Sequence, residues 1–295
     1  MNRKSLGLVI VFAAALMTPV ALSQAVNPAL QPVQAAEGYA EFSGFRLWYK
    51  DTGGSGIPVV LLHPMTGSTD SWGYQYPALT AAGYRVIAFD RRGNGRTVAD
   101  PASDTPPHSD AEDLQLLMNY LHIGRFHLVG SAAGAFCAFD YALSYPARLR
   151  SLVIANSIGG VQDASFLDLG SRLRPSPQFE ALPVEFRELG PSYRASDPGG
   201  TERWLEIYRA SQPAQPFPRR APKNQITLSA LETIATPTLL ITGDADLYAP
   251  PPVQQQFRAR IKGSESVVIP EAGHSAYWER PEQFNRSVVS FLEKH

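Results

Sequence analysis

The residues with the clearest chemical potential lie in three segments that are far apart in the chain. Residues 130–134 read Gly-Ser-Ala-Ala-Gly and carry the flanking glycines of a G-x-S-x-G sequence, whose central serine is a nucleophile on a sharp strand-to-helix turn. Here the central position holds Ala132. Asp246 and His274 follow in the order in which such sites supply their acid and their base. The pattern predicts a histidine–aspartate pair that can act as a general base. It also predicts that the neighbouring turn lacks the nucleophilic oxygen of a serine.

The glycines of this turn are what its geometry requires. A nucleophile turn is strained and crowded, and Gly130 and Gly134 leave room for the strand and the helix to approach each other. Ser131 lies one residue before the nucleophile position, and a neighbour in a tight turn points in another direction. We expect Ser131 to bond to local backbone groups. Its use as a displaced nucleophile is the alternative, and that use requires hydrogen-bond reach to a base.

His274 is the candidate general base. It follows Gly273 after an apolar segment, in a turn that exposes an imidazole. Asp246 is the candidate partner, which would hold the imidazole tautomer and stabilise the imidazolium. Asp244 lies nearby and ranks below Asp246. A surface histidine in an ordinary turn is the alternative, which the presence of a correctly ordered acid disfavours.

Composition excludes several classes of function. The chain has 295 residues, 44% hydrophobic and 18% charged, with a formal net charge of −1, and shows no basic run. Nucleic-acid binding and electrostatic attachment to a membrane surface are therefore not expected. Cys137 is the single cysteine, so no internal disulfide is possible. No histidine pair has metal-binding spacing. We expect a small-molecule substrate, no metal and no organic cofactor, while the oligomeric state is left open.

The first residues have the pattern of a secretory signal. A basic start at residues 2–4 is followed by an apolar stretch over residues 6–22 and by small residues at 23–25. We expect a signal peptide over residues 1–25, with residues 33–35 as a second cleavage candidate, and a flexible leader over residues 26–38. An uncleaved membrane anchor is the alternative. The predicted location is exported, either periplasmic or secreted, without stable membrane association after cleavage.

The remaining chain alternates short apolar runs with amphipathic stretches, which is typical of a parallel sheet covered by helices. A hairpin is expected over residues 42–49, and strands are expected at 59–62, 84–89, 126–129, 152–155, 238–242 and 266–269. Helices are expected at 109–121, 135–145, 252–261 and 281–292. Residues 159–230 break the alternation. We interpret residues 39–158 and 231–295 as one core and residues 159–230 as a helical and loop insertion.

Five segments of the chain together resemble the α/β-hydrolase superfamily, in its cap-bearing, esterase- and haloperoxidase-like form. In chain order they are residues 62–65, 89–97, 127–134, 241–246 and 270–274. The resemblance spans the chain from about residue 40 to its end. It implies an α/β fold with a mostly parallel eight-stranded sheet flanked by helices, and a helical cap inserted after the sixth strand.

The resemblance also implies an oxyanion hole built from backbone N–H groups. By position its donors are Met65, after the third strand, and Ala133, after the nucleophile position. Alanine at residue 132 removes neither donor. Pro64 departs from the glycine that is usual there, and it lacks an N–H. His63 is expected to orient this loop, with a role as second base as the alternative.

Three functions remain compatible with Ala132. The preferred one is hydrolysis of a small ester, lactone or related acyl bond, in which the His274–Asp246 pair works without a seryl intermediate. A base-catalysed lyase or C–C bond-cleaving reaction would need the same pair and belongs to this first possibility, an enzyme without a seryl intermediate. The second possibility is an ordinary esterase whose nucleophilic serine has been replaced by alanine. The third is a ligand-binding protein without catalysis that retains the pocket.

Overall fold

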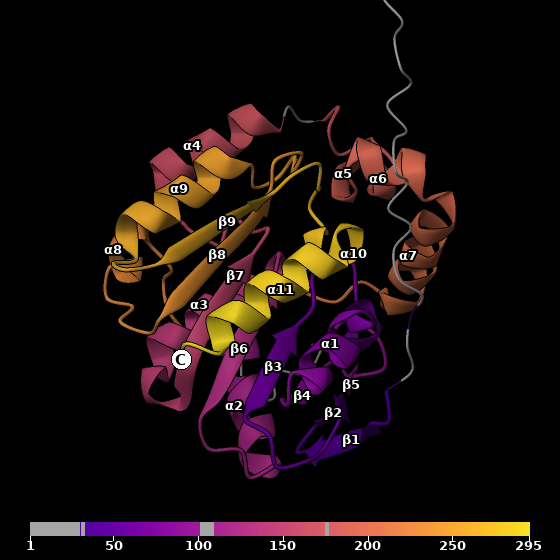
Figure 1. Ribbon diagram of the computed structural model, residues 1–295, viewed down its shortest axis with the longest axis vertical. Helices are drawn as coiled ribbons and strands as arrows, with labels where there is room; N and C mark the ends of the chain where they lie inside the picture. Colours follow the sequence, from indigo (N-terminus) through magenta and orange to yellow (C-terminus); the bar gives the residue numbers. More distant parts are fainter. Residues whose placement is uncertain (1–29, 31–32, 101–108, 175–176) are drawn as a thin grey trace, which may run out of the picture.

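The computed structural model describes residues 30, 33–100, 109–174 and 177–295. The predicted signal peptide lies outside these residues, as do residues 26–29 and 31–32 of the predicted leader. The described chain folds around one mixed sheet with strand order β1-β2-β4-β3-β6-β7-β8-β9, and β5 pairs with β2 (Figure 1). The strands are β1 Ala36–Phe42, β2 Phe45–Asp51, β3 Pro58–Leu62, β4 Arg85–Phe89, β5 Val98–Ala99, β6 Phe126–Ser131, β7 Leu149–Ala155, β8 Thr238–Gly243 and β9 Glu265–Ile269.

The sheet is parallel from β4 to β9 and antiparallel at the β1–β2 and β2–β4 pairs. This confirms the predicted fold class. Seven strands of the main path lie where they were expected, whereas β1 lies almost wholly before the predicted hairpin at 42–49. The ninth strand, β5, has only two residues, too few for a recognisable sequence pattern. β1 begins at Ala36, inside the predicted leader, and turns into β2 at residues 43–44 as a hairpin.

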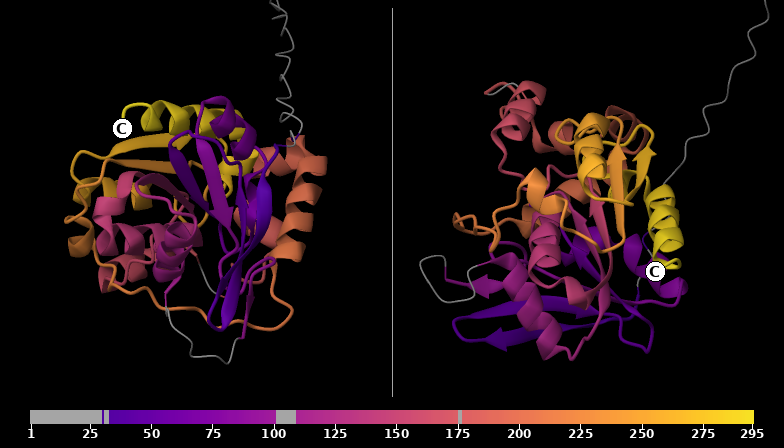
Figure 2. Two further views of the ribbon diagram at one scale, coloured as in Figure 1. Left: turned by 90° about the horizontal axis from the view of Figure 1, so that it is seen from below. Right: turned by 90° about the vertical axis from the view of Figure 1, so that its left-hand side faces the viewer.

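Helices cover both faces of the sheet (Figure 2). Strand residues alternate between two cores, so Val60 and Leu62 pack into one and Val59 and Leu61 into the other. The first core is closed by α2 Asp110–Tyr120, α3 Ala133–Ser144 and α9 Pro251–Arg260, and the second by α1 Gln75–Ala81 and α11 Pro281–Leu292. None of the described helices is both long and apolar enough to cross a membrane.

The insertion between β7 and β8 is helical, as predicted. It contains α4 Ala164–Leu173, α5 Val184–Glu188, α6 Pro191–Ser196, α7 Pro198–Ser211 and α8 Leu228–Leu231. Counted along the chain without β5, β7 is the sixth strand, which is where the cap was expected. Figure 1 shows α5, α6 and α7 grouped together on the side of α10 (Ala276–Glu279), the short helix that follows the histidine loop.

The start of α2 illustrates how local sequence sets an element boundary. The Ser109 hydroxyl accepts a hydrogen bond from the Glu112 N–H at 3.2 Å, and the Glu112 carboxylate returns to the Ser109 N–H at 3.3 Å. This reciprocal capping box satisfies two backbone donors at the helix start. The helix thus begins close to the predicted start at residue 109. Two of the three acidic residues in its first turn, Asp110 and Asp113, form ion pairs with Arg91 and Arg92 of the loop after β4.

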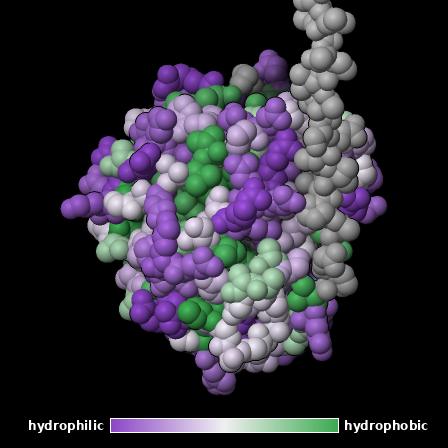
Figure 3. Space-filling model, in the orientation of Figure 1, coloured by the Kyte–Doolittle hydropathy of each residue, from purple (hydrophilic) through white to green (hydrophobic). Residues whose placement is uncertain are grey.

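The edge strand β9 leaves apolar surface uncovered. Figure 3 shows hydrophobic residues along this part of the molecule, and Val268 is 43% exposed. An ion pair between Lys294 Nζ and Glu265 Oε2, at 2.8 Å, borders the strand. Charge beside an exposed edge disfavours pairing with a second sheet.

Candidate active site

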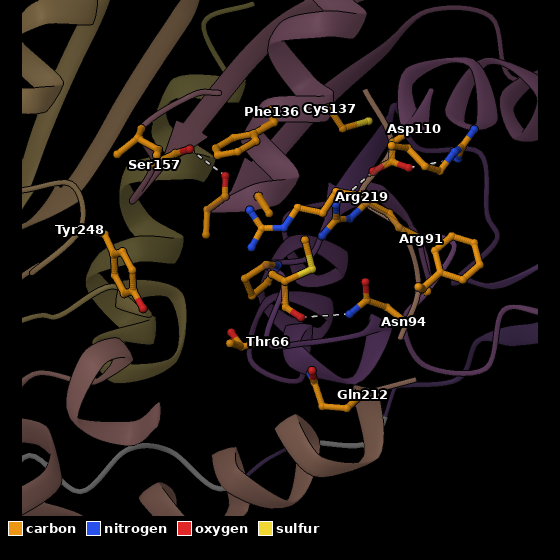
Figure 4. A pocket seen from close by; sticks show the side chains of 18 of the residues that line it. Thr66, Arg91, Asn94, Asp110, Phe136, Cys137, Ser157, Gln212, Arg219 and Tyr248 are labelled. Carbon is orange, nitrogen blue, oxygen red and sulfur yellow. Dashed lines mark hydrogen bonds and ion pairs between the residues drawn. The ribbon is translucent and has the colours of Figure 1, made fainter. Parts of the chain in front are cut away.

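Residue 132 has the strained backbone of a nucleophile turn. Ala132 lies between β6 and α3 with φ +50° and ψ −115°, which side-chain-bearing residues rarely adopt. Its N–H donates to Ala155 O at 2.9 Å, and its carbonyl accepts from the Ala135 N–H at 3.1 Å. The Ser157 hydroxyl also donates to that carbonyl, at 2.7 Å (Figure 4). The turn is thus held from several sides although it presents only a methyl group.

The flanking glycines are required by close approach. A Cβ on Gly134 would stand 2.1 Å from the Leu62 carbonyl oxygen, and one on Gly130 would stand 2.7 Å from Gly134 O. Both obstacles are backbone atoms, which cannot rotate away. α3 therefore begins in contact with the end of β3, which brings the loop after β3 next to residue 132.

Ser131 does not behave as predicted. Its hydroxyl is fully buried and has no hydrogen-bond partner among the described residues, so the expected bond to local backbone is wrong. The side chain extends from the last position of β6 and does not line the cavity described below. The structure therefore places Ser131 away from the surface where a displaced nucleophile would have to act.

The structure brings His274 and Asp246 together. His274 Nδ1 lies 2.9 Å from both carboxylate oxygens of Asp246. Asp246 is fixed in turn, since Oδ1 accepts from the N–H groups of Tyr248 at 2.8 Å and Ala249 at 2.9 Å. Asp244, ranked lower from the sequence, instead accepts from the Glu271 N–H at 2.6 Å and does not reach the histidine.

Asn156 is a further support that sequence reasoning missed. Its Nδ2 donates to Asp246 Oδ2 at 3.1 Å and to Gly273 O at 3.0 Å. Asn156 follows β7 and has φ +45°, a conformation that asparagine tolerates better than most residues. Its amide joins the acid loop to the histidine loop, so the relative position of His274 and Asp246 depends on a third loop.

The electrostatics of the pair favour the protonated form of the His274 imidazole. Burial disfavours the charged form of His274, but the charge and hydrogen bond of Asp246 outweigh burial and raise its pKa above the ordinary 6.5. Burial opposes ionisation of Asp246 as well, yet His274 and the hydrogen-bonding neighbours hold the pKa of Asp246 below its usual 3.8. The pair is therefore arranged to stabilise an imidazolium beside a carboxylate.

A buried carboxylate supports the histidine loop from below. Glu279 accepts hydrogen bonds from the N–H groups of Gly273 at 2.9 Å, Gly190 at 2.8 Å and Ser275 at 3.2 Å. Burial raises the pKa of Glu279 to about 7, although these amide hydrogen bonds favour the charged form. Glu279 thus accepts hydrogen bonds from the residues before and after His274 and, at Gly190, from the cap.

A cavity of about 620 Å³ opens in front of the pair. Its lining includes Ala132, Ala133, Met65 and His274, together with cap residues of α5 and of the segment before α8. Figure 4 shows Tyr248 on one side of this space, and Arg91 and Asn94 on the other. The Tyr248 ring also packs against the His274 imidazole, with centroids 4.5 Å apart.

The charged side chains of the lining are mostly paired. Arg91 binds Asp110 at 3.1 Å, Arg187 binds Glu180 at 2.9 Å, and Asp140 accepts from the N–H groups of Lys223 and Asn224, each at 2.8 Å. Glu188 differs, because its Oε2 is buried without a hydrogen-bond partner in the described part of the chain.

The loop after β3 is fixed by His63. This imidazole is fully buried, with Nδ1 2.7 Å from Pro64 O and Nε2 accepting from the Arg91 N–H at 3.0 Å. Burial lowers its pKa well below 6.5, so it stays neutral. Asn94 Nδ2 donates to Met65 O at 3.0 Å (Figure 4). His63 thus has both nitrogens occupied in holding the loop, which leaves none for a second base.

Both candidate oxyanion donors lie on the cavity wall. Among the described residues, the backbone N–H groups of Met65 and Ala133 donate to no backbone carbonyl outside the regular elements, and both residues line the cavity. The described residues hold no group of three or more potential metal ligands. Cys137 also lines the cavity, and burial raises the pKa of its thiol well above the ordinary value, so the thiolate is disfavoured.

Comparison with known proteins identifies related sequences over most of the chain. A sequence profile described as the alpha/beta hydrolase family matches residues 59–287. A 2-hydroxy-6-oxononadienedioate/2-hydroxy-6-oxononatrienedioate hydrolase of Burkholderia vietnamiensis is 28% identical over 277 residues, covering 84% of this chain and 91% of the relative. A 2-hydroxy-6-oxo-6-phenylhexa-2,4-dienoate hydrolase of Comamonas testosteroni is 27% identical over 273 residues, covering 86% and 93%.

Solved structures of related proteins have the same fold as this chain. A thermophilic esterase from Thermogutta terrifontis matches with a TM-score of 0.71 at 26% identity, covering 88% of this chain and 98% of the esterase. A bromoperoxidase from Bacillus anthracis matches with a TM-score of 0.67 at 23% identity, covering 88% and 100%, which supports the fold alone.

Proposed function

The chain belongs to the alpha/beta hydrolase family, and on that premise we propose that it hydrolyses a small ester, lactone or related acyl bond by direct attack of water. The observation that carries the proposal is the His274–Asp246 pair, whose histidine lines the same cavity as Ala132. A buried histidine–aspartate pair with perturbed pKa values is more typical of a catalytic site than of a site that only binds a ligand.

The division of labour follows from the geometry. Asp246 holds the His274 Nδ1–H, which leaves Nε2 as the basic atom. Neutral His274 removes a proton from water as the water oxygen bonds to the acyl carbon. The imidazolium then returns the proton to the leaving oxygen as its bond to that carbon breaks. Asp246 stabilises the intervening positive charge.

The developing negative charge needs donors of its own. In this proposal the N–H groups of Met65 and Ala133 bind the oxyanion, since backbone amides fixed before the reaction stabilise it without reorganisation. The close approach of Gly134 to Leu62 and His63 places the start of α3, with Ala133, against the end of β3, which Met65 follows. Support for this role comes from the position of both residues on the cavity wall.

The absence of a serine limits the substrates. Removing the nucleophile from a serine hydrolase costs a factor of about 10⁶ in kcat, while binding and the oxyanion hole retain about 10³–10⁴ over water. Activated esters and strained lactones are therefore the expected substrates. The 2-hydroxy-6-oxo acid hydrolases among the relatives make C–C bond hydrolysis the second candidate, because it also requires proton transfer by a histidine.

The test compares three proteins on p-nitrophenyl acetate, p-nitrophenyl butyrate and an aliphatic lactone. Wild type is expected to turn over, His274→Ala to be much slower than wild type, and neither to react with a serine-directed phosphonate. Ala132→Ser is expected to gain phosphonate labelling and a burst of p-nitrophenol. Equal rates for wild type and His274→Ala, together with tight ligand binding, would instead establish a binding protein.

Export is part of the same proposal. The basic start, the apolar stretch and the small residues near positions 23–25 support a cleaved signal over residues 1–25. Intact-mass measurement of protein recovered from the periplasm or the medium tests it. Recovery of the uncleaved chain in the membrane fraction would contradict cleavage.

A further inference from the structure

Glu188 is a buried carboxylate that the proposed mechanism does not yet use. It ends α5 in the cap, is only 7% exposed, and lines the cavity together with His274 and Ala132. Its Oε2 has no hydrogen-bond partner in the described part of the chain. A buried carboxylate oxygen without a partner is costly, which makes it a site where water or substrate binds when present.

The other carboxylates of the lining have partners. Asp110 is bound by Arg91 and Arg220, Asp140 by backbone amides, and Glu180 by Arg187. Within the described lining, Glu188 is therefore the acid with an oxygen left over.

Glu188 is held beside the histidine by its backbone as well. The Ser275 N–H, next to His274, donates to Glu188 O at 3.1 Å. Burial raises the pKa of Glu188, whereas His274 and the Thr66 hydroxyl favour its charged form. In the opposite direction, Glu188 is among the groups that raise the pKa of His274, after Asp246. The two side chains therefore act on each other across the cavity wall.

We propose that Glu188 and His274 together hold the water that attacks the substrate. The inference rests on the proposed function. The Ala132 side chain carries no oxygen, so in this mechanism the nucleophile comes from solvent. A water that donates one hydrogen bond to each acceptor keeps a lone pair free to attack the acyl carbon. One water proton passes to His274 Nε2 while the water oxygen bonds to that carbon. The second proton stays on the water oxygen and donates a hydrogen bond to the Glu188 carboxylate. Glu188 thereby acts as a catalytic residue that takes up no proton.

The side-chain variants distinguish this role from a merely electrostatic one. Glu188→Gln keeps one acceptor oxygen, and Glu188→Leu keeps volume without any acceptor. We expect the pH-independent kcat to fall about tenfold in the first and about a hundredfold in the second, within the range of a lost positioned proton acceptor. An effect through charge alone would move the acidic limb of the pH–rate profile equally in both variants and leave the plateau unchanged, which would overturn the proposal.

Glu185→Gln is the matched control. It makes the same chemical change on the same helix, and Glu185 does not line the cavity. Its kcat should equal that of wild type. Thermal unfolding of all three variants identifies any loss that comes from misfolding.

A second background separates failure of this inference from failure of the proposed function. In Ala132→Ser the serine oxygen replaces water in acylation, and water acts only in deacylation. Adding Glu188→Leu should leave the p-nitrophenol burst rate unchanged and slow the steady-state rate that follows by about a hundredfold, by the same lost contact. An unchanged steady-state rate would overturn the role of Glu188, even if wild-type protein shows no turnover.

Discussion

The carboxylate of Glu279 accepts a hydrogen bond from the backbone N–H of Gly190 at 2.8 Å. Glu279 belongs to α10 in the core, whereas Gly190 precedes α6 in the cap. Because the same carboxylate binds the amides on both sides of His274, the cap and the base share one buried support. A substitution of Glu279 is therefore expected to change both the stability of the fold and the position of His274.

The first prediction concerns stability against pH. Burial raises the pKa of Glu279 from 4.5 to about 7, so the folded protein binds this proton more tightly than the unfolded chain. The resulting stabilisation is fully present below about 4.5 and is lost as pH rises through about 7. It amounts to about 3 kcal/mol, at about 1.4 kcal/mol per pKa unit. Urea unfolding between pH 4 and 8 should show this decline in wild type.

Glu279→Gln is the comparison for that series. The glutamine cannot titrate, so the difference in unfolding free energy between the two proteins should change with pH over the same window. Parallel curves would show that Glu279 does not titrate there. Because Gln has one acceptor oxygen instead of two, a lower kcat at unchanged KM is also expected.

The second prediction concerns the pH–rate profile. The base must be neutral to accept a proton, and Asp246 raises the pKa of His274 above 6.5 despite burial. The rate should therefore increase with pH and level off only above that value. Asp246→Asn should lower kcat by up to about 10⁴, the loss found when a triad aspartate is replaced by asparagine. An acidic limb centred at or below 6.5 in wild type would contradict the role given to Asp246.

The third prediction uses the strained backbone at residue 132. Ala132 has φ +50°, a conformation that costs about 1–3 kcal/mol for a residue with a side chain. Glycine accepts it freely but adds about 0.4–1 kcal/mol of entropy to the unfolded chain. We therefore expect Ala132→Gly to stabilise the protein by about 1 kcal/mol, measured by urea unfolding. Ala132→Val should destabilise it, and the reverse order would show that the turn is not strained.

Much of the site is predictable because its parts are local. The turn at residue 132 is recognisable from glycines two residues away, and His274 from the glycine before it. The order of strands and helices follows from alternating apolar runs. These features depend on neighbours in the chain, which a sequence displays directly.

The residues that hold the site in place, by contrast, interact with partners far away in the chain. Asn156 and Asp246 are 90 positions apart, and Gly190 and Glu279 are 89 positions apart. No spacing rule connects such pairs, since they meet only after the sheet and the cap have formed. Glu188 was missed for the same reason. The wrong expectation for Ser131 arose because a buried strand end leaves its hydroxyl without local backbone partners.

The fourth prediction tests the contact that joins the turn to the loop after β3. A methyl group on Gly134 would stand 2.1 Å from Leu62 O and 2.8 Å from His63 O, so α3 or β3 must move. Gly134→Ala is expected to destabilise the protein by about 1–3 kcal/mol, as overpacking does. It should also lower kcat, because the displaced helix carries the Ala133 donor away from Met65.

Gly124→Ala is the control for this change. A Cβ at Gly124 meets no atom within 4 Å, and its φ is not in the left-handed region. Its unfolding free energy should match wild type or slightly exceed it, because alanine restricts the unfolded chain. If Gly134→Ala and Gly124→Ala had the same stability and the same kcat, the close approach of α3 to β3 would not be what holds the two backbone donors together.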